Sequence, residues 1–269
     1  MGKERLTEKD MGLQHRCPGE SYTINDSICR GRQRANYPKC NVCLEKVEPV
    51  SFRHSQAESK LSMGIFKSYD IRGKYPAEID EPTTRKIGTA IAQFFKEKNP
   101  KTKNIVVGRD MRPSSKSLAN ALIEGLCTAG LDVVNIGVVS TEMTYFAVGY
   151  YQYDGSVMVT ASHNPAEYNG FKICKEQAIP VSFETGIDRI AKLTKQYYPP
   201  RVEQLGKVVL GDIFGDYKKH VLKFAGNLRH LRIVIDAGNG MAGKVIPIIC
   251  EGLPIEIIPL YFELDGSFP

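Results

Sequence analysis

The segment from Ser156 to Lys172, S-V-M-V-T-A-S-H-N-P-A-E-Y-N-G-F-K, places a serine, a histidine and a lysine close together after an apolar run. Ser162 follows a predicted strand, where a hydroxyl is exposed enough to act as a nucleophile. A serine is a weak nucleophile until a neighbouring group takes its proton or stabilises its charge. His163 is adjacent, but neighbours on a turn usually point apart, so the pair does not imply a Ser-His dyad. A polar turn without chemistry explains the same residues, and both interpretations stay open.

Three arginines lie in two further loops of the same region. They are Arg72 in Y-D-I-R-G, and Arg109 and Arg112 in G-R-D-M-R-P-S-S. Guanidinium groups suit phosphate oxygens because they donate hydrogen bonds in pairs at fixed geometry. Taken singly, each arginine is better explained as a surface or ion-paired residue. Together with Ser162 and Lys172 they indicate an anion pocket, while the absence of a G-x-S-x-G sequence disfavours a hydrolase of that architecture.

The elements that must position these residues alternate between helices and strands. The apolar spacing predicts helices over 83–98, from 114 to before Gly130, and from 141 onward, and strands over 105–107, 133–136 and 157–159. This alternation predicts an α/β fold with a largely parallel sheet between helices. The ligand site of such a sheet lies beyond the carboxyl ends of its strands, which is where T-A-S-H-N-P falls.

A second α/β pattern begins after the Y-Y-P-P sequence at Tyr197–Pro200. It predicts a helix near 212–225, a strand over 231–235, another helix after D-A-G-N-G, and a strand over 255–258. The sequence stops at D-G-S-F-P, too soon for this second unit to complete a sheet of ordinary size. We therefore expect the second unit to be incomplete.

The first 62 residues show no clear periodicity and form a polar leader that contains cysteines. Its cysteines are Cys17, Cys29, Cys40 and Cys43. The last two form C-N-V-C, a spacing that lets two thiolates bind one Zn²⁺. Zinc ribbons usually carry a second C-x-x-C pair, which is missing from this leader. A zinc site and free cysteines in a poorly ordered leader both remain open.

The composition excludes several classes of function. The 269 residues include 42% hydrophobic and 25% charged residues, as in ordinary globular proteins. No apolar run is long enough to cross a bilayer, and the polar N-terminus is not a secretory signal, so we expect a cytoplasmic protein without a membrane partner. The net charge of +6 is spread along the chain. Because nucleic-acid binding needs a concentrated basic patch, we expect no nucleic-acid partner, although R-G-R-Q-R (30–34) is the best candidate for one.

Five segments, in order, carry a resemblance to a known family. They are F-K-S-Y-D-I-R-G, V-V-G-R-D-M-R-P-S-S, V-M-V-T-A-S-H-N-P-A-E-Y-N-G-F-K, V-I-D-A-G-N-G-M-A-G and L-D-G-S-F-P. In these segments the chain resembles the α-D-phosphohexomutases, the family of phosphomannomutase and phosphoglucomutase. The resemblance implies a leader over 1–62, a phosphohexomutase domain I over 63–205 with a mixed, largely parallel sheet, and an incomplete domain II over 206–269.

The same resemblance implies a phosphotransferase (isomerase) that interconverts hexose 1-phosphate and hexose 6-phosphate. Ser162 corresponds to the serine that, when phosphorylated, donates its phosphoryl group to a sugar phosphate and forms a bisphosphorylated sugar. Arg72 and Lys172 correspond to positions for proton handling and phosphate contact, and His163 completes the catalytic loop. The remaining residues expected to bind the substrate phosphate are Tyr69, Asn164 and Arg109.

Two further ligands, Mg²⁺ and hexose 1,6-bisphosphate, are implied only by this resemblance. Mg²⁺ would bind the phosphate on Ser162, and the bisphosphate would act as activator. The family's magnesium loop D-x-D-x-D-R, its sugar-recognition loop and its C-terminal phosphate loop do not occur in this chain. We therefore expect a truncated, weakly active or inactive mutase. The alternative is a non-catalytic module that binds a sugar phosphate or a partner, with a zinc-binding leader.

Overall fold

The computed structural model describes residues 14–16, 23–25, 63–200 and 202–269. The chain divides into two compact units, Met1–Glu58 and Ser59–Pro269. In the first unit, β1 (Gln14–Arg16) pairs antiparallel with β2 (Thr23–Asn25). The cysteines of the predicted zinc site lie outside the described residues: Cys17, Cys29, Cys40 and Cys43.

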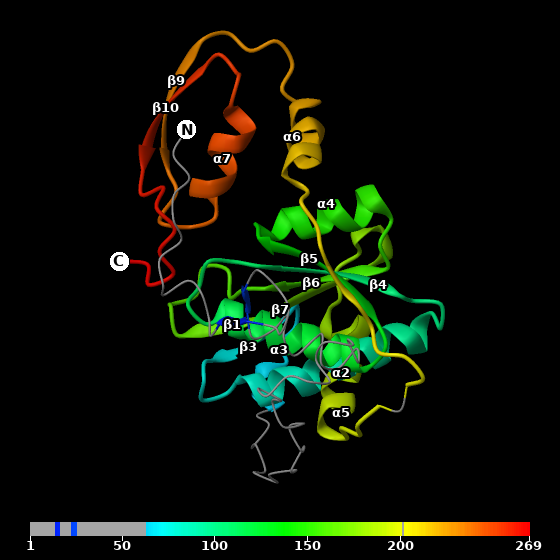
Figure 1. The fold of residues 1–269 in the computed structure, drawn as a ribbon. Coiled ribbons are helices and arrows are strands. Elements are labelled where there is room, and N and C mark those ends of the chain that lie inside the picture. Colours follow the sequence, from blue (N-terminus) through cyan, green and yellow to red (C-terminus); the bar gives the residue numbers. More distant parts are fainter. Residues whose placement is uncertain (1–13, 17–22, 26–62, 201) are drawn as a thin grey trace. The chain divides into compact units, whose positions relative to one another are not determined.

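A six-stranded sheet with the order β3-β7-β6-β4-β5-β8 forms the centre of the second unit (Figure 1). Its strands are β3 (Ile71–Lys74), β4 (Asn104–Arg109), β5 (Asp132–Val138), β6 (Gly155–Val159), β7 (Tyr168–Lys175) and β8 (Val208–Leu210). Only β7 runs against the others, since β6 and β3 both pair with it antiparallel and the remaining pairs are parallel. The predicted α/β fold with a mixed, largely parallel sheet is confirmed.

Helices and short helical turns connect these strands. They are η2 (Met63–Ile65), α2 (Glu81–Lys98), α3 (Ser115–Thr128), α4 (Thr141–Tyr151), η3 (Glu176–Ala178), η4 (Phe183–Ile187) and α5 (Asp188–Lys195). The side chain of Asp80 caps α2 by accepting a hydrogen bond from the backbone N–H of Thr83. Ser114 occupies the predicted cap position of α3, but its side chain makes no cap bond and instead accepts a hydrogen bond from Asn169.

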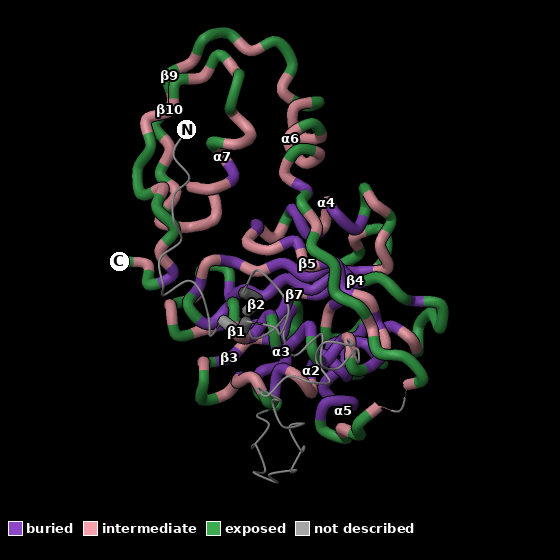
Figure 2. The backbone as a smooth tube through the Cα atoms, viewed as in Figure 1, coloured by how far each residue is buried: buried purple, intermediate pink, exposed green. Residues whose placement is uncertain are grey.

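Alternate residues of the central strands point to opposite faces of the sheet and build two separate cores. Ile105 and Val107 of β4 pack with α2, α3 and α5, whereas Val106 between them packs with α4. The strands are therefore buried on both faces, as the burial colours show (Figure 2). A sheet covered on both sides exposes only its edges and strand ends to a ligand.

Strand β7 was not predicted, although it contains Y-N-G-F-K. It lies between β3 and β6, so Arg72 of β3 is paired with Gly170 of β7. The backbone N–H of Thr160, just after β6, bonds to the carbonyl oxygen of the same Gly170 at 2.9 Å. This insertion brings Arg72 within two strands of the T-A-S-H-N-P turn.

The C-terminal part of the second unit contains α6 (Phe214–Leu222), β9 (Leu231–Asp236), α7 (Ala242–Cys250) and β10 (Ile255–Leu260). Strands β9 and β10 form a parallel pair in which every residue is half-buried or exposed (Figure 2). Strand β8, in contrast, extends the main sheet by pairing with β5. No helix in the described residues has the length and apolar character required to cross a bilayer.

We predict that Gly170→Ala lowers the free energy of unfolding by about 1–3 kcal/mol, the usual cost of overpacking. A Cβ at this position would lie 2.0 Å from the carbonyl oxygen of Ile71 and 3.0 Å from the Cα of Arg72, so β3 would have to move. Urea titration measures the effect. Gly149→Ala is the matched control, because a Cβ added there in α4 would meet no atom within 4 Å, and it should not destabilise. Equal stability of both variants would contradict the close packing of β3 on β7.

Candidate active site

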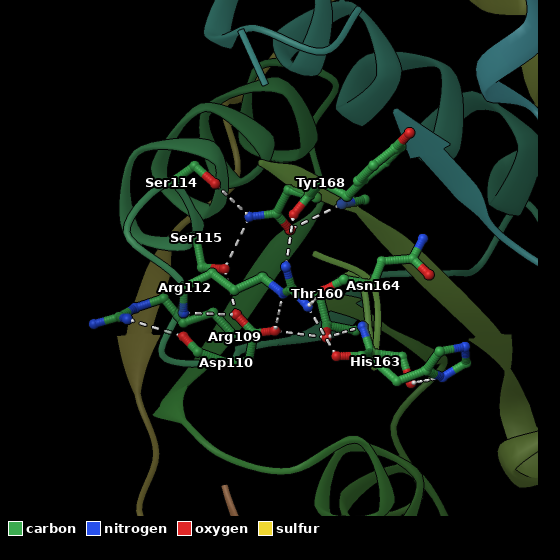
Figure 3. A network of polar contacts seen from close by, with 12 residues as sticks. Arg109, Asp110, Arg112, Ser114, Ser115, Thr160, His163, Asn164 and Tyr168 are labelled. Carbon is green, nitrogen blue, oxygen red and sulfur yellow. Dashed lines mark hydrogen bonds and ion pairs between the residues drawn. The ribbon is translucent and has the colours of Figure 1, made fainter. Parts of the chain in front are cut away.

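Two polar loops lie side by side where β4 and β6 end (Figure 3). The strands are parallel, with Arg109 opposite Val159, and the backbone N–H of Asp110 bonds to the carbonyl oxygen of Val159 at 3.0 Å. The G-R-D-M-R-P sequence therefore leaves the sheet next to T-A-S-H-N-P. This arrangement confirms that the predicted loops meet at the carboxyl edge of the sheet.

The buried carboxylate of Asp110 is the centre of a hydrogen-bond network that links these loops (Figure 3). Its Oδ2 accepts a hydrogen bond from Thr160 Oγ1 at 2.6 Å, and its Oδ1 accepts from the backbone N–H of Arg112 at 3.1 Å. The hydroxyl of Ser115, at the start of α3, also donates to Oδ1. Since buried carboxylates are costly unless paired and hydrogen-bonded, this network explains how Asp110 remains buried.

Ser162 adopts a left-handed backbone conformation, with φ of 56°. This region is unfavourable for residues other than glycine and costs roughly 1–2 kcal/mol. The backbone N–H of Ser162 bonds to Thr160 Oγ1 at 2.8 Å, so Thr160 connects the strained residue to Asp110. The serine side chain is exposed, and its Oγ lies 3.4 Å from Nδ1 of His163. The expectation that these neighbours point apart therefore differs from the structure, although the contact is long and open to solvent.

Arg112 is almost completely buried, with 1% of its surface exposed, and its guanidinium donates to backbone carbonyl oxygens of the serine loop. The acceptors are Ser162 at 2.9 Å, Asn164 at 2.6 Å, Pro165 at 2.7 Å and Tyr168 at 3.0 Å. Its Nε lies 3.2 Å from Oδ2 of Asp110, an ion pair without hydrogen-bond geometry. Burial lowers the pKa of Arg112 and Asp110 opposes that shift, and an arginine stays charged throughout. Arg112 thus binds the loop, whereas the sequence had indicated a member of the anion pocket.

Arg72 and Lys172 share one buried carboxylate, that of Asp70. Nη2 of Arg72 lies 2.8 Å and Nζ of Lys172 lies 3.5 Å from Oδ2 of Asp70. Nη1 of Arg72 donates to Oδ1 of Asn164 at 3.0 Å, which connects this cluster to the serine loop. Both cationic side chains remain about one quarter exposed, at 28% and 26%. Two cations around one carboxylate leave a net positive charge that faces solvent, which favours an anion.

Tyr69 and Arg109, two of the residues expected to bind the substrate phosphate, are not among the side chains that pair with Asp70. Tyr69 is 78% exposed. The side chain of Arg109 extends away from His163 across the network (Figure 3), and its Nη1 donates to the carbonyl oxygen of Asp110 at 3.2 Å. Burial and repulsion from Arg109 both lower the pKa of Lys244. Arg109 therefore interacts with the Asp110 backbone and with the cation Lys244 of α7.

Ser162 and His163 line a cleft of about 470 Å³. This volume lies within the range of small-molecule sites, roughly 300–1,000 Å³. The cleft is also lined by residues from β6 and the loops around it, including Asp110, Met158 and Thr160, and by residues near α7, including Gly240, Met241 and Val245. The exposed serine hydroxyl therefore has space for a substrate of modest size.

The described residues do not offer a donor set that fits Mg²⁺. No group of three or more His, Cys, Asp or Glu side chains in this part of the chain could hold a metal ion. The two carboxylates of the site, Asp70 and Asp110, are already engaged by cations and hydroxyl groups. Magnesium prefers free oxygen ligands, so we derive no step through it.

Sequence reasoning missed the residues that hold the site together. Asp70, Asp110 and Thr160 lie within the motifs Y-D-I-R-G, G-R-D-M-R-P-S-S and T-A-S-H-N-P, but the motifs predicted no role for them. The signal for Asp110 and Thr160 is position, because each directly follows a buried strand and must find a partner at the sheet edge. Asp70 instead directly precedes β3. The partner of Asp110 is separated from it by 50 residues, so no local spacing identifies Thr160.

The fold and site define an α/β/α domain that presents a serine hydroxyl at its strand ends beside a cationic cluster. Domain I of the phosphoglucomutase/phosphomannomutase family, described as alpha/beta/alpha, matches residues 63–200. The chain belongs to this family.

The chain is also similar to individual phosphomannomutases and to a solved structure of the family. The chain is 39% identical over 211 residues to a phosphomannomutase of Vibrio cholerae, which covers 76% of this chain and 46% of that protein. It is 40% identical over 213 residues to a phosphomannomutase of Escherichia coli, and this alignment covers 76% of this chain and 46% of that protein. A crystal structure of a phosphoglucomutase/phosphomannomutase family protein from Burkholderia thailandensis superposes with a TM-score of 0.69 at 33% identity, covering 78% of this chain and 46% of that one. The chain spans about half the length of these relatives.

We predict that Asp110→Asn lowers the free energy of unfolding by about 3–5 kcal/mol, because it leaves the buried Arg112 cation without its counter-ion. Glu124→Gln is the control, since Glu124 forms an exposed ion pair with Arg85 and should contribute less than about 1 kcal/mol. Urea denaturation of both variants measures the difference. A loss below about 1 kcal/mol in Asp110→Asn would show that the pair does not hold the loops.

Proposed function

We propose that this chain carries the phosphoryl-accepting serine of a phosphohexomutase, and that its substrates are hexose phosphates of the glucose and mannose type. The observation that carries the proposal is the exposed Ser162 hydroxyl, which lines a cleft. In the same loop, Asn164 accepts a hydrogen bond from the cation Arg72. The names of the relatives, phosphomannomutases among them, support the substrate class. Because the chain spans about half of those proteins, the activity of the whole enzyme is part of the proposal.

The proposed step transfers a phosphoryl group between a sugar oxygen and Ser162. Oγ of Ser162 attacks the phosphorus of a hexose 1,6-bisphosphate, the bond from phosphorus to the sugar oxygen breaks, and the serine proton ends on that oxygen. The products are phosphoserine and a hexose monophosphate. Phosphoserine can in turn donate its phosphoryl group to the free hydroxyl of a hexose monophosphate, which gives the 1,6-bisphosphate. Transfer of the phosphate at the other position back to Ser162 then gives the isomeric monophosphate.

Charge neutralisation and positioning dominate the energetics of phosphoryl transfer. Arg72 and Lys172 supply cations that can approach the transferred group, and Asp70 fixes their direction. We propose that His163, whose Nδ1 lies 3.4 Å from the serine oxygen, receives or returns the serine proton. Asn164 orients Arg72 through its side-chain oxygen.

We predict that incubation with a labelled hexose 1,6-bisphosphate places the label on Ser162. The Ser162→Ala variant should take up no label, because it lacks the accepting oxygen. Ser182→Ala is the control, since Ser182 only caps the turn Phe183–Ile187, and it should label like the unmodified chain. Label that persists in Ser162→Ala would disprove the assignment, and sugar-phosphate binding without labelling would favour the non-catalytic module.

We predict that Arg72→Ala and Lys172→Ala each weaken binding of glucose 1-phosphate or mannose 1-phosphate by about tenfold or more. Hydrogen bonds from charged donors contribute roughly 1.5–3 kcal/mol each, which corresponds to that factor. Calorimetry measures the affinities after circular dichroism has shown that the variants remain folded. Arg189→Ala is the control, because Arg189 pairs with Glu97 between α5 and α2. Unchanged affinity in both site variants would leave the cluster without a role in binding.

We predict that the 269-residue chain turns over these monophosphates far more slowly than the usual enzyme range of about 1–1,000 per second. The reason is that Asp70 and Asp110 are occupied by cations, so neither is free to help hold a divalent cation against the phosphoserine. A coupled assay with added Mg²⁺ measures the rate. Turnover within the usual range would refute this expectation without affecting the assignment of Ser162.

A further inference from the structure

We infer that Arg112 is a positioning residue that holds Ser162 in its reactive conformation through the backbone of the serine loop. The inference rests on the proposed function, since it concerns how the accepting serine is presented. Arg112 does not contact the serine hydroxyl and does not itself line the cleft, but it contacts three lining residues: it binds the carbonyl oxygen of Ser162, pairs with Asp110 and lies 4.8 Å from the ring centroid of Phe268. Its effect on the serine hydroxyl therefore passes through the backbone of the loop.

The geometry shows that both backbone polar groups of Ser162 are bound. Its carbonyl oxygen accepts a hydrogen bond from Nη2 of Arg112 at 2.9 Å, and its N–H donates to Thr160 Oγ1 at 2.8 Å. Both partners converge on the carboxylate of Asp110. A left-handed serine persists only where the surroundings over-determine it, and these two bonds do so.

The same guanidinium fixes the rest of the loop. Nη2 also donates to the carbonyl oxygen of Asn164, and Nη1 donates to those of Pro165 and Tyr168. A planar fork can bind several oxygens at fixed angles, whereas the compact ammonium of lysine cannot span them. Because Asn164 also receives Nη1 of Arg72, Arg112 sets the position of the cationic cluster relative to Ser162.

Hydrogen exchange of the whole chain tests the inference independently of activity. The amides of Ser162, Asn164 and Tyr168 are bonded within the loop and report its order. In Arg112→Met we expect their exchange to accelerate by at least about tenfold, the factor expected for losing a charged hydrogen bond. Amides of α2 and α3 that exchange through local fluctuations should stay within about twofold of the unmodified chain, whereas those that exchange only through global unfolding should follow the loss of stability measured by urea denaturation. Arg189→Met is the control, because it removes one positive charge from an exposed ion pair with Glu97. It should leave the exchange rates of the loop amides unchanged.

Kinetics of Ser162 labelling by hexose 1,6-bisphosphate separate positioning from folding. We expect Arg112→Met to lower the maximal labelling rate by at least about tenfold, with the half-saturating concentration changed by less than about threefold. A purely structural role would reduce the fraction of chains that label, not the rate of those that do. Arg112→Lys should recover much of the stability but not the rate, since it keeps the charge without the fork.

Several results would overturn the inference. Loop exchange that stays at the level of the unmodified chain in Arg112→Met would show that the guanidinium does not hold the loop. Acceleration spread evenly over the described part of the chain would assign Arg112 to general stability. If Arg112→Met does not fold, Thr160→Val tests the same constraint from the N–H of Ser162, and unchanged exchange of that amide contradicts it. If the unmodified chain takes no label, the proposed function fails, while loop exchange still decides the inference.

Discussion

The buried ion pair between Asp110 and Arg112 is the interaction on which the site depends. Removing two charges from water is costly, and hydrophobic residues often stabilise a core as well as such a pair does. Here both ions satisfy further polar groups: the carboxylate binds Thr160 and the start of α3, and the guanidinium binds backbone carbonyl oxygens of the serine loop. The pair therefore connects the loops that follow the neighbouring strands β4 and β6. An apolar substitute could fill the volume but could not determine the conformation of Ser162.

The sheet supplies the second constraint. Strands β4 and β6 are parallel neighbours, so their loops must emerge at the same edge, and the antiparallel strand β7 carries Lys172 back beside β3 and Arg72. Asp70 then gathers both cations on one carboxylate. The two ion-pair systems thus differ: the buried pair binds the serine loop, and the cluster around Asp70 leaves positive charge at the surface.

Much of the fold could be predicted from the sequence, because the helices carry apolar residues at helical spacing and the parallel strands β4, β5 and β6 contain short apolar runs. The helix predicted over 83–98 and the strand over 105–107 agree with α2 and β4, which extend a few residues further. Strand β7 was missed, since Asn169, Gly170 and Lys172 interrupt its apolar residues, whereas Val157-Met158-Val159 of β6 is a continuous apolar run. Ser162, Arg72 and Lys172 were predicted as site residues from local motifs and the family resemblance. Asp110 and Arg112 were not understood, because their partners lie about 50 residues away and depend on strand order.

Phosphopeptide mass spectrometry of the purified chain, before and after exposure to hexose 1,6-bisphosphate, tests the central claim most directly. The claim is that the Asp110–Arg112 pair presents Ser162 as a phosphoryl acceptor. The account predicts one added phosphoryl group on the peptide that contains T-A-S-H-N-P, located at Ser162 and strongly reduced in Arg112→Met chains that remain folded. Phosphate on another residue, or equal phosphorylation of Ser162 in the variant, would contradict it.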